Sequence, residues 1–219
     1  MKHQLFKQIL NKMVDFLLPA YCVCCGKNGS VLCSGCYQLI HFNLQPITNR
    51  LICHDHLDQV VTLAVYQPPI SQLIKALKYQ HVKLAGSELA KLLYWHLQIP
   101  EHNLISYAPI SRGRLNERGF NQAQLIATNL AKLLNKPSVS LLLKSRETKK
   151  QAHSTIDQRL KNLENSFVVD PTTKEIIPNS IIVIIDDVIS TGSTLDKCAK
   201  VLKEAGAKEV IGVALAQSL

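Results

Sequence analysis

The sequence predicts an α/β protein with a mainly parallel sheet, helices on both faces and a small N-terminal module rich in cysteine. Two observations lead to this fold. β-rich apolar runs alternate with segments of helical periodicity after about residue 58, which favours parallel strands joined by crossover helices. Six of the seven cysteines lie in residues 22–53, which marks a separate unit. We therefore expect a cysteine module within residues 1–58 and an α/β domain over residues 59–219.

The expected elements follow one another in chain order. β-branched and apolar runs predict strands at residues 60–66, 104–108, 139–143, 167–169, 181–185 and 210–215. Apolar residues at helical spacing predict helices at residues 70–79, 84–97, 122–134 and 195–205. Gly206 is the expected stop of the last helix. Ligands of such sheets bind where the strands end, so the polar residues after each strand are the candidates for function.

Composition limits the classes of partner. The chain has 219 residues and is 47% hydrophobic, enough for a sizeable core. Its net charge of +9 suits phosphorylated ligands or nucleic acid, although an ordinary basic surface gives the same balance. No apolar run reaches about 18 residues, so we expect no transmembrane segment. Residues 1–18 have helical apolar spacing without the apolar core of a secretion signal. We expect a packed helix there in a cytoplasmic protein, with a peripheral position at the inner face of the membrane as the alternative.

The strongest functional signal is the run of residues 181–195. Its first five residues are β-rich and apolar, which predicts a strand buried on both faces. Asp186 and Asp187 follow where this strand is expected to end, and residues 190–194 form a Ser/Thr/Gly turn before a helix. Backbone N–H groups in such a turn bind phosphate, and paired carboxylates accept hydrogen bonds from sugar hydroxyls or hold a divalent cation through water. The run therefore predicts a sugar-phosphate site. An ordinary buried strand would leave the acidic pair unexplained.

Two further segments are rich in positive charge. Ser111, Arg112, Gly113 and Arg114 are expected to form a turn after the strand at residues 104–108, and this turn suits a polyanion such as pyrophosphate. Residues 144–161 contain six Lys or Arg residues and few apolar ones. They predict an exposed segment that serves as a lid over a ligand, as a nucleic-acid contact or as a plain solvated linker.

The cysteines predict a metal site. Cys22 with Cys25 and Cys33 with Cys36 form two C-x2-C pairs, and two such pairs complete a tetrahedral zinc site. A site closed by four thiolates is structural, and a module this small needs a cross-link such as a bound metal to fold. We therefore expect structural zinc.

Alternatives for the cysteines remain. Cys24 is able to replace a neighbouring ligand, and residues 53–56 (Cys-His-Asp-His) offer a second or alternative site. Free thiols, or redox chemistry at Cys22 and Cys25, are the competing interpretations. Cys198 lies in a helical pattern and is expected to be a small buried side chain.

Several segments resemble known phosphoribosyltransferase-like proteins. The acidic pair and the turn at residues 190–194 resemble the motif with which type I phosphoribosyltransferases bind phosphoribosyl pyrophosphate (PRPP). Residues 118–122 read Arg-Gly-Phe-Asn-Gln, which is similar to a signature of the ComF/GntX family of ComFC-type competence proteins. Residues 73–79 resemble a segment of that family ending in Lys-Tyr. The resemblance covers nearly the whole chain.

The resemblance implies a type I phosphoribosyltransferase fold with a PRPP site. Asp186, Asp187 and Arg146 are the implied catalytic residues, and Mg²⁺ would accompany PRPP, held mainly by PRPP oxygens and water. The implied PRPP-binding residues are Asp186, Asp187, Val188, Ser190, Thr191, Gly192, Ser193, Thr194, Ser111, Arg112, Gly113, Arg114, Lys78 and Tyr79.

Two functions follow from the resemblance. One is a PRPP-binding protein of natural transformation that handles incoming single-stranded DNA beside proteins of the DNA-uptake machinery. The other is an active phosphoribosyltransferase with an unidentified acceptor and no DNA role. Aromatic residues that stack on bases are few, at 5% of the chain. The candidates are Tyr79, Trp95, Tyr107 and Phe120, of which we expect Trp95 and Phe120 to pack in the core.

Overall fold

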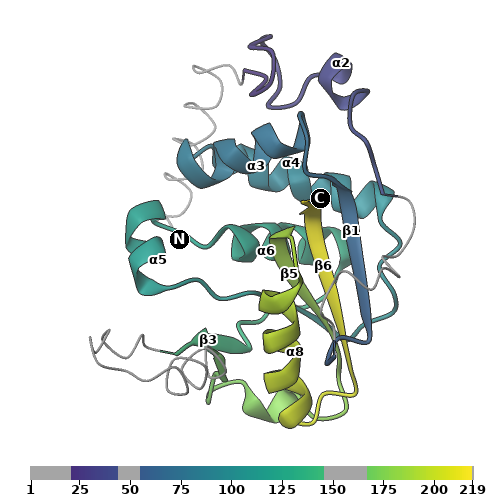
Figure 1. The fold of residues 1–219 in the computed structure, drawn as a ribbon, viewed down its shortest axis with the longest axis vertical. Helices are drawn as coiled ribbons and strands as arrows, with labels where there is room; N and C mark the ends of the chain where they lie inside the picture. Colours follow the sequence, from purple (N-terminus) through teal and green to yellow (C-terminus); the bar gives the residue numbers. More distant parts are fainter. Residues whose placement is uncertain (1–20, 44–54, 146–166, 219) are drawn as a thin grey trace, which may run out of the picture.

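The computed structural model describes residues 21–43, 55–145 and 167–218, and four strands of this part form a parallel sheet (Figure 1). The strand order is β1-β6-β5-β2, and all three neighbouring pairs run parallel. The sheet consists of β1 (Gln59–Val65), β2 (Leu104–Tyr107), β5 (Ile181–Ile189) and β6 (Glu209–Gln217). The predicted parallel sheet is confirmed.

Helices cover both faces of this sheet, as predicted. One face carries α3 (Ile70–Tyr79), α4 (Lys83–His96) and α6 (Gln122–Leu134), and the other carries α8 (Ser193–Glu204). The remaining described elements are α2 (Ser34–Tyr37), α5 (Arg112–Arg118), β3 (Leu142–Lys144), β4 (Phe167–Val169) and the 3₁₀ helix η1 (Lys174–Ile176). None of the described helices has the length and apolar content needed to cross a membrane.

Strand β5 lies between two apolar layers. Val183 and Ile185 belong to the core cluster on the α3, α4 and α6 side, whereas Ile182 and Ile184 belong to the cluster on the α8 side. All four side chains are fully buried. Successive side chains of a strand point to opposite faces, so a strand covered on both sides must be apolar throughout. This explains the uninterrupted isoleucine and valine run.

The predicted end of this strand was wrong. β5 continues through Asp186 and Asp187 to Ile189, and Asp186 remains in register with Ala214 of β6. The backbone ladder therefore extends past the apolar run. The two carboxylates lie within the strand rather than after it, and the predicted anion-binding turn follows from Ser190.

Two other local expectations were also wrong. The arginine turn forms the short helix α5, which Ser111 caps and Gly119 ends in the left-handed region at φ 71°. The strand expected at residues 139–143 is not part of the main sheet. Only an isolated bridge between Ser138 and Ile105 reaches β2, and β3 pairs antiparallel with β4 in a separate two-stranded sheet.

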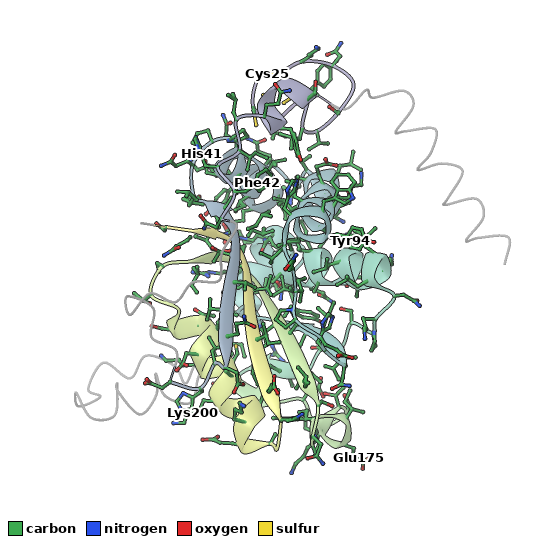
Figure 2. All side chains as sticks on the ribbon, turned by 90° about the vertical axis from the view of Figure 1, so that its right-hand side faces the viewer. Cys25, His41, Phe42, Tyr94, Glu175 and Lys200 are labelled. Carbon is green, nitrogen blue, oxygen red and sulfur yellow. The ribbon has the colours of Figure 1, made fainter. Side chains whose placement is uncertain are left out.

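The cysteine module packs against the end of α4 and the edge of β1 (Figure 2). Tyr37 Oη lies 2.6 Å from His96 Nε2, and the Phe42 ring stacks on His96 with a centroid separation of 3.9 Å. The His41 carbonyl accepts a hydrogen bond from the Val65 backbone N–H in β1. The buried residues of the module belong to the same core cluster as α3 and α4. Figure 2 places Cys25 at the outer end of the module, away from this contact.

Some expectations concern residues outside the described part of the chain. These are the helix at residues 1–18, Cys53 and His54, and the candidate lid beyond Ser145, including Arg146.

Packing between α6 and the sheet generates a stability prediction. Leu130 is 0% exposed, whereas Leu133 on the same helix is 42% exposed. We expect Leu130→Ala to lower the free energy of unfolding by about 2–5 kcal/mol, because it removes buried methyl groups and leaves a cavity. Leu133→Ala is the matched control and should change it by less than about 0.5 kcal/mol. Urea unfolding followed by circular dichroism measures both, and equal losses would contradict the assigned packing.

Candidate functional site

The acidic pair joins elements from opposite faces of the sheet. Lys78, at the end of α3, places its Nζ 2.8 Å from Asp187 Oδ1, and the two side chains are 16% and 17% exposed. Asp186 instead lines a small pocket formed with residues 188–195 on the α8 side. The backbone N–H of Asp187 donates to Asp186 Oδ1 at 2.8 Å. Neighbouring carboxylates are thus directed toward different partners, as alternation along a strand requires.

The environment of Asp186 disfavours its ionised form. Burial, followed by the negative charge of Asp187, raises its pKa to about 7. The Asp187 backbone N–H and the charges of Lys78 and Arg114 act in the opposite direction. The site therefore holds a carboxyl whose charged form needs a cation or further hydrogen-bond donors.

The loop after β5 is shaped like an anion site. Gly192 precedes α8 with φ 78°, in the left-handed region that glycine adopts without strain. Thr191 Oγ1 and Ser193 Oγ lie 2.8 Å apart, and the Ser193 backbone N–H donates to Thr191 Oγ1 at 3.5 Å. The N-cap residue Gly192 has no side chain with which to cap the following N–H groups of α8. The free N–H groups of α8 and these hydroxyls border the pocket, which suits a phosphate group.

The first turn of α8 is also tied to the segment before β1. Asp196 accepts hydrogen bonds from the His56 backbone N–H at 2.8 Å and from His56 Nδ1 at 3.0 Å, with the ring nitrogen acting as donor. His56 thus holds the helix beneath the anion loop. The alternative metal site at residues 53–56 includes Cys53 and His54, which lie outside the described residues, so it stays a prediction.

The predicted pyrophosphate segment lies partly near this site. Ser111 caps α5, and its Oγ accepts from the Arg114 backbone N–H at 3.4 Å. Arg112, Gly113 and Arg114 are exposed. The charge of Arg114 lowers the pKa of Asp186, which places this arginine within electrostatic reach of the acidic pair.

The segment at residues 118–122 connects α5, α6 and the end of β2. Asn121 Oδ1 caps α6 by accepting from the Ala123 backbone N–H at 3.0 Å, and Asn121 Nδ2 donates to the Ala108 carbonyl at 2.9 Å. Arg118 Nη1 donates to Gln122 Oε1 at 3.1 Å. These hydrogen bonds fix where the polypeptide leaves the sheet. They give Asn121 and Gln122 of this segment a structural role.

The four aromatic residues considered for base stacking differ in solvent exposure. Tyr107 is buried and Phe120 is partly buried, whereas Tyr79 is 63% exposed and Trp95 is 61% exposed. The expectation of a core position for Trp95 was wrong, because this residue lies near the end of α4 on its outer side. The Arg118 guanidinium carbon lies 5.4 Å from the Tyr79 ring centroid.

Four cysteines form a cluster that is able to bind a metal. The Sγ atoms of Cys22, Cys25, Cys33 and Cys36 all lie within 4.8 Å of one another, and Cys25 and Cys33 approach to 3.6 Å. A tetrahedral four-thiolate site with metal–sulfur bonds of about 2.3 Å requires sulfur separations of about 3.8 Å. The donor set and its spacing therefore fit.

The pKa values of the Cys22 and Cys24 thiols are shifted in opposite directions. Burial raises the pKa of Cys22, but backbone N–H groups, led by that of Cys33, bring it down to about 6. Burial and then the charge of Cys22 raise the pKa of Cys24 to about 12, and its Sγ donates to the Pro69 carbonyl at 3.8 Å. Cys24 therefore lies next to the cluster, but it is not one of the four thiols that approach one another within 4.8 Å.

Comparisons with known proteins agree with this arrangement. A family model described as "Phosphoribosyl transferase domain" matches residues 120–218, which include the acidic pair and the anion loop. Competence protein F of Haemophilus influenzae is 31% identical over 207 residues, 84% of this chain and 88% of that protein. DNA utilization protein YhgH of Escherichia coli K12 is 32% identical over 162 residues, 69% of each chain.

More distant relatives and solved structures also align. Competence protein ComFC of Bacillus subtilis is 29% identical over 106 residues, 48% of this chain and 40% of that protein. The glutamine PRPP amidotransferase of B. subtilis in complex with ADP and GMP is 19% identical with a TM-score of 0.45, over 60% of this chain and 26% of that one. An adenine phosphoribosyltransferase of Thermoanaerobacter pseudethanolicus is also 19% identical, with a TM-score of 0.39 over 65% and 72%. With the match to competence protein F over 84% of the chain and the matched domain model, this chain belongs to the ComF-type family of phosphoribosyltransferase-like competence proteins.

Proposed function

We propose that this protein binds PRPP and acts in natural transformation, where it handles incoming single-stranded DNA. The observation that carries the PRPP assignment is the position of the acidic pair beside the anion loop, on one strand end within the matched domain. Relatives named competence protein F and DNA utilization protein support the DNA role, and the net charge of +9 suits a polyanionic partner.

Each part of PRPP has a suitable partner at the site. The 5′-phosphate would accept hydrogen bonds from the loop at residues 190–194 and from the first turn of α8. The ribose hydroxyls would donate to Asp186 and Asp187. The pyrophosphate would face the positive charges of Lys78 and Arg114, with Tyr79, Ser111, Arg112 and Gly113 beside them. Arg146 lies outside the described residues and remains a predicted catalytic residue.

The ion pair of Lys78 with Asp187 would be affected when PRPP binds. A ribose hydroxyl that donates to Asp187 competes with the Lys78 ammonium for the same carboxylate. Lys78 is then available to contact the pyrophosphate of the ligand, which carries most of the negative charge. Ligand binding would thus shift the positive charge of Lys78 from Asp187 toward the pyrophosphate.

Magnesium fits the site only together with the ligand. Two carboxylates are too few for an ion that takes six oxygens, so PRPP oxygens and water would complete its shell. When bound, Mg²⁺ neutralises charge on the pyrophosphate.

Zinc is the metal that we propose for the four-cysteine cluster. Four thiolates at tetrahedral spacing are typical of closed structural zinc sites. Cys22, Cys25, Cys33 and Cys36 would hold it, and the metal would cross-link the two knuckles without taking part in chemistry.

Calorimetric titration with PRPP and Mg²⁺ tests the proposed ligand. We expect Asp186→Asn and Asp187→Asn each to weaken PRPP binding by about ten- to a hundredfold, because each removes a charge-assisted hydrogen bond. Glu175→Gln is the control, since Glu175 is exposed at the far end of the molecule (Figure 2). Wild-type protein that binds no PRPP, or variants that bind it as wild type does, would reject the assignment.

A turnover assay separates binding from catalysis. Pyrophosphate release is measured with PRPP, Mg²⁺ and either free nucleobases or single-stranded DNA as acceptor. Release that Asp187→Asn abolishes would favour the active transferase. Tight PRPP binding without release favours a protein that uses PRPP as a signal.

The raised pKa of Asp186 predicts a pH-dependent stability difference. Between the ordinary Asp value and about 7, the folded protein binds more protons than the unfolded chain, so stability falls as pH rises through this window. Asn cannot ionise, yet its Oδ1 still accepts from the Asp187 N–H. We expect Asp186→Asn to match wild type near pH 4 and to melt at a higher temperature near pH 8. A pH-independent difference in melting temperature would show that Asp186 ionises normally.

Metal analysis tests the cysteine assignment. We expect about one zinc atom per chain in the purified protein, lost in Cys25→Ser. Cys24→Ser is the matched control and should keep the metal, because Cys24 is not one of the four clustered thiols and its Sγ donates to the Pro69 carbonyl. Loss of zinc from Cys24→Ser, or its retention in Cys25→Ser, would contradict the ligand set.

A further inference from the structure

Two connecting segments meet beside the acidic pair and bring cations against aromatic rings. Tyr79 ends α3, His81 lies in the link to α4 and Lys83 begins α4. Arg118 ends α5, and Phe120 lies in the link to α6. Lys83 Nζ lies 5.5 Å from the Phe120 ring centroid, and the His81 ring meets Phe120 edge-on at 6.3 Å. The Arg118 guanidinium lies 5.4 Å from the Tyr79 ring centroid. We call these five residues the aromatic–cationic strip.

We propose that the aromatic–cationic strip is the surface on which this protein holds single-stranded DNA. The inference rests on the proposed DNA role and identifies the residues that perform it. Proteins that bind single strands without sequence preference combine positive charge for the phosphates with aromatic rings for the bases. The strip supplies both within two short segments.

Exposure and charge make the strip available to a ligand. Tyr79 is 63% exposed, and His81 and Lys83 are exposed as well. Among the described residues, neither Lys83 nor Arg118 takes part in an ion pair. Their charges are therefore not neutralised by a neighbouring carboxylate. One face of the Tyr79 ring is backed by a cation, which strengthens its stacking on a base.

The guanidinium of Arg118 is held in a fixed orientation. It donates through Nη1 to Gln122 Oε1, and Gln122 is only 1% exposed. Arg118 Nε and Gln122 Nε2 are buried, and neither has an acceptor among the described residues. These two buried donors are not accessible to a ligand, so the junction offers a phosphate only the accessible part of the Arg118 guanidinium, held in a fixed orientation.

The chemistry of the strip favours a single strand over a duplex or PRPP. A base is free to stack on a protein ring only when it is not already stacked in a double helix. Tyr79 lies beside the proposed position of the pyrophosphate, but PRPP has no base, so a ligand that stacks on the exposed Tyr79 ring must bring one. Trp95 is equally exposed, but its neighbour Lys91 pairs with Glu88, and no described cation lies against the Trp95 ring.

Fluorescence anisotropy with a labelled oligothymidylate of about 20 nucleotides tests the strip in the full chain at several salt concentrations. We expect Tyr79→Ala to weaken binding by about 5- to 100-fold with the salt dependence unchanged, and Tyr79→Phe to bind as wild type. Lys83→Ala should lower the slope of log affinity against log salt by about 0.7, because it removes one phosphate contact. Trp95→Ala is the matched aromatic control and should bind as wild type.

The outcomes separate this inference from the proposed function. Wild-type protein that binds no oligothymidylate overturns both the DNA role and the strip. That result leaves the PRPP assignment unaffected, because calorimetric titration tests it independently. Wild-type binding that persists unchanged in Tyr79→Ala and Lys83→Ala, or that falls in Trp95→Ala instead, overturns the strip alone. A duplex of the same length that binds as tightly, and loses affinity equally in Tyr79→Ala, also overturns it.

Discussion

Burial of β5 between two apolar layers determines where the polar groups of the candidate site lie. Because its side chains alternate between the α3 side and the α8 side, the strand continues into two carboxylates that face different partners. Asp187 meets Lys78 of α3, and Asp186 borders the loop before α8. Burial of two adjacent carboxylates is unfavourable without compensating charge. The raised pKa of Asp186 reflects this, and hydroxyl donors or a divalent cation would compensate its charge.

Helix α3 connects this site to the cysteine module. Its N-cap residue is Pro69, whose carbonyl accepts from Cys24, and Lys78 lies in its last turn. The module also packs on α4 through Tyr37 and His96. A helix transmits a displacement of one end to the other, so the fold of the cysteine module helps to position the lysine that neutralises Asp187. A metal bound by the four cysteines would therefore stabilise the candidate site from a distance, without entering it.

Much of the fold could be predicted from local pattern. The bounds of α3 and α6 match their predicted ranges, because each has a clear apolar stripe and Asn121 marks the start of α6. Helix α5 was missed because it buries none of its residues, so no apolar stripe exists to predict it. The extension of β5 through two aspartates depends on backbone pairing with β6, and aspartate has low strand propensity. Likewise, periodicity identifies α4 but does not tell that Trp95 lies on its exposed side.

The sequence predicted which residues form the candidate site, but not which of them contact one another. The acidic pair and the loop follow from chain-local sequence, but the contact of Lys78 with Asp187 and the link from His56 to Asp196 join distant segments. The most direct test is a crystal structure with PRPP and Mg²⁺ bound. The account predicts the 5′-phosphate within residues 190–194, the ribose hydroxyls on Asp186 and Asp187, and Lys78 displaced toward the pyrophosphate. PRPP bound elsewhere, or an intact ion pair between Lys78 and Asp187 with the ribose remote from both carboxylates, would contradict it.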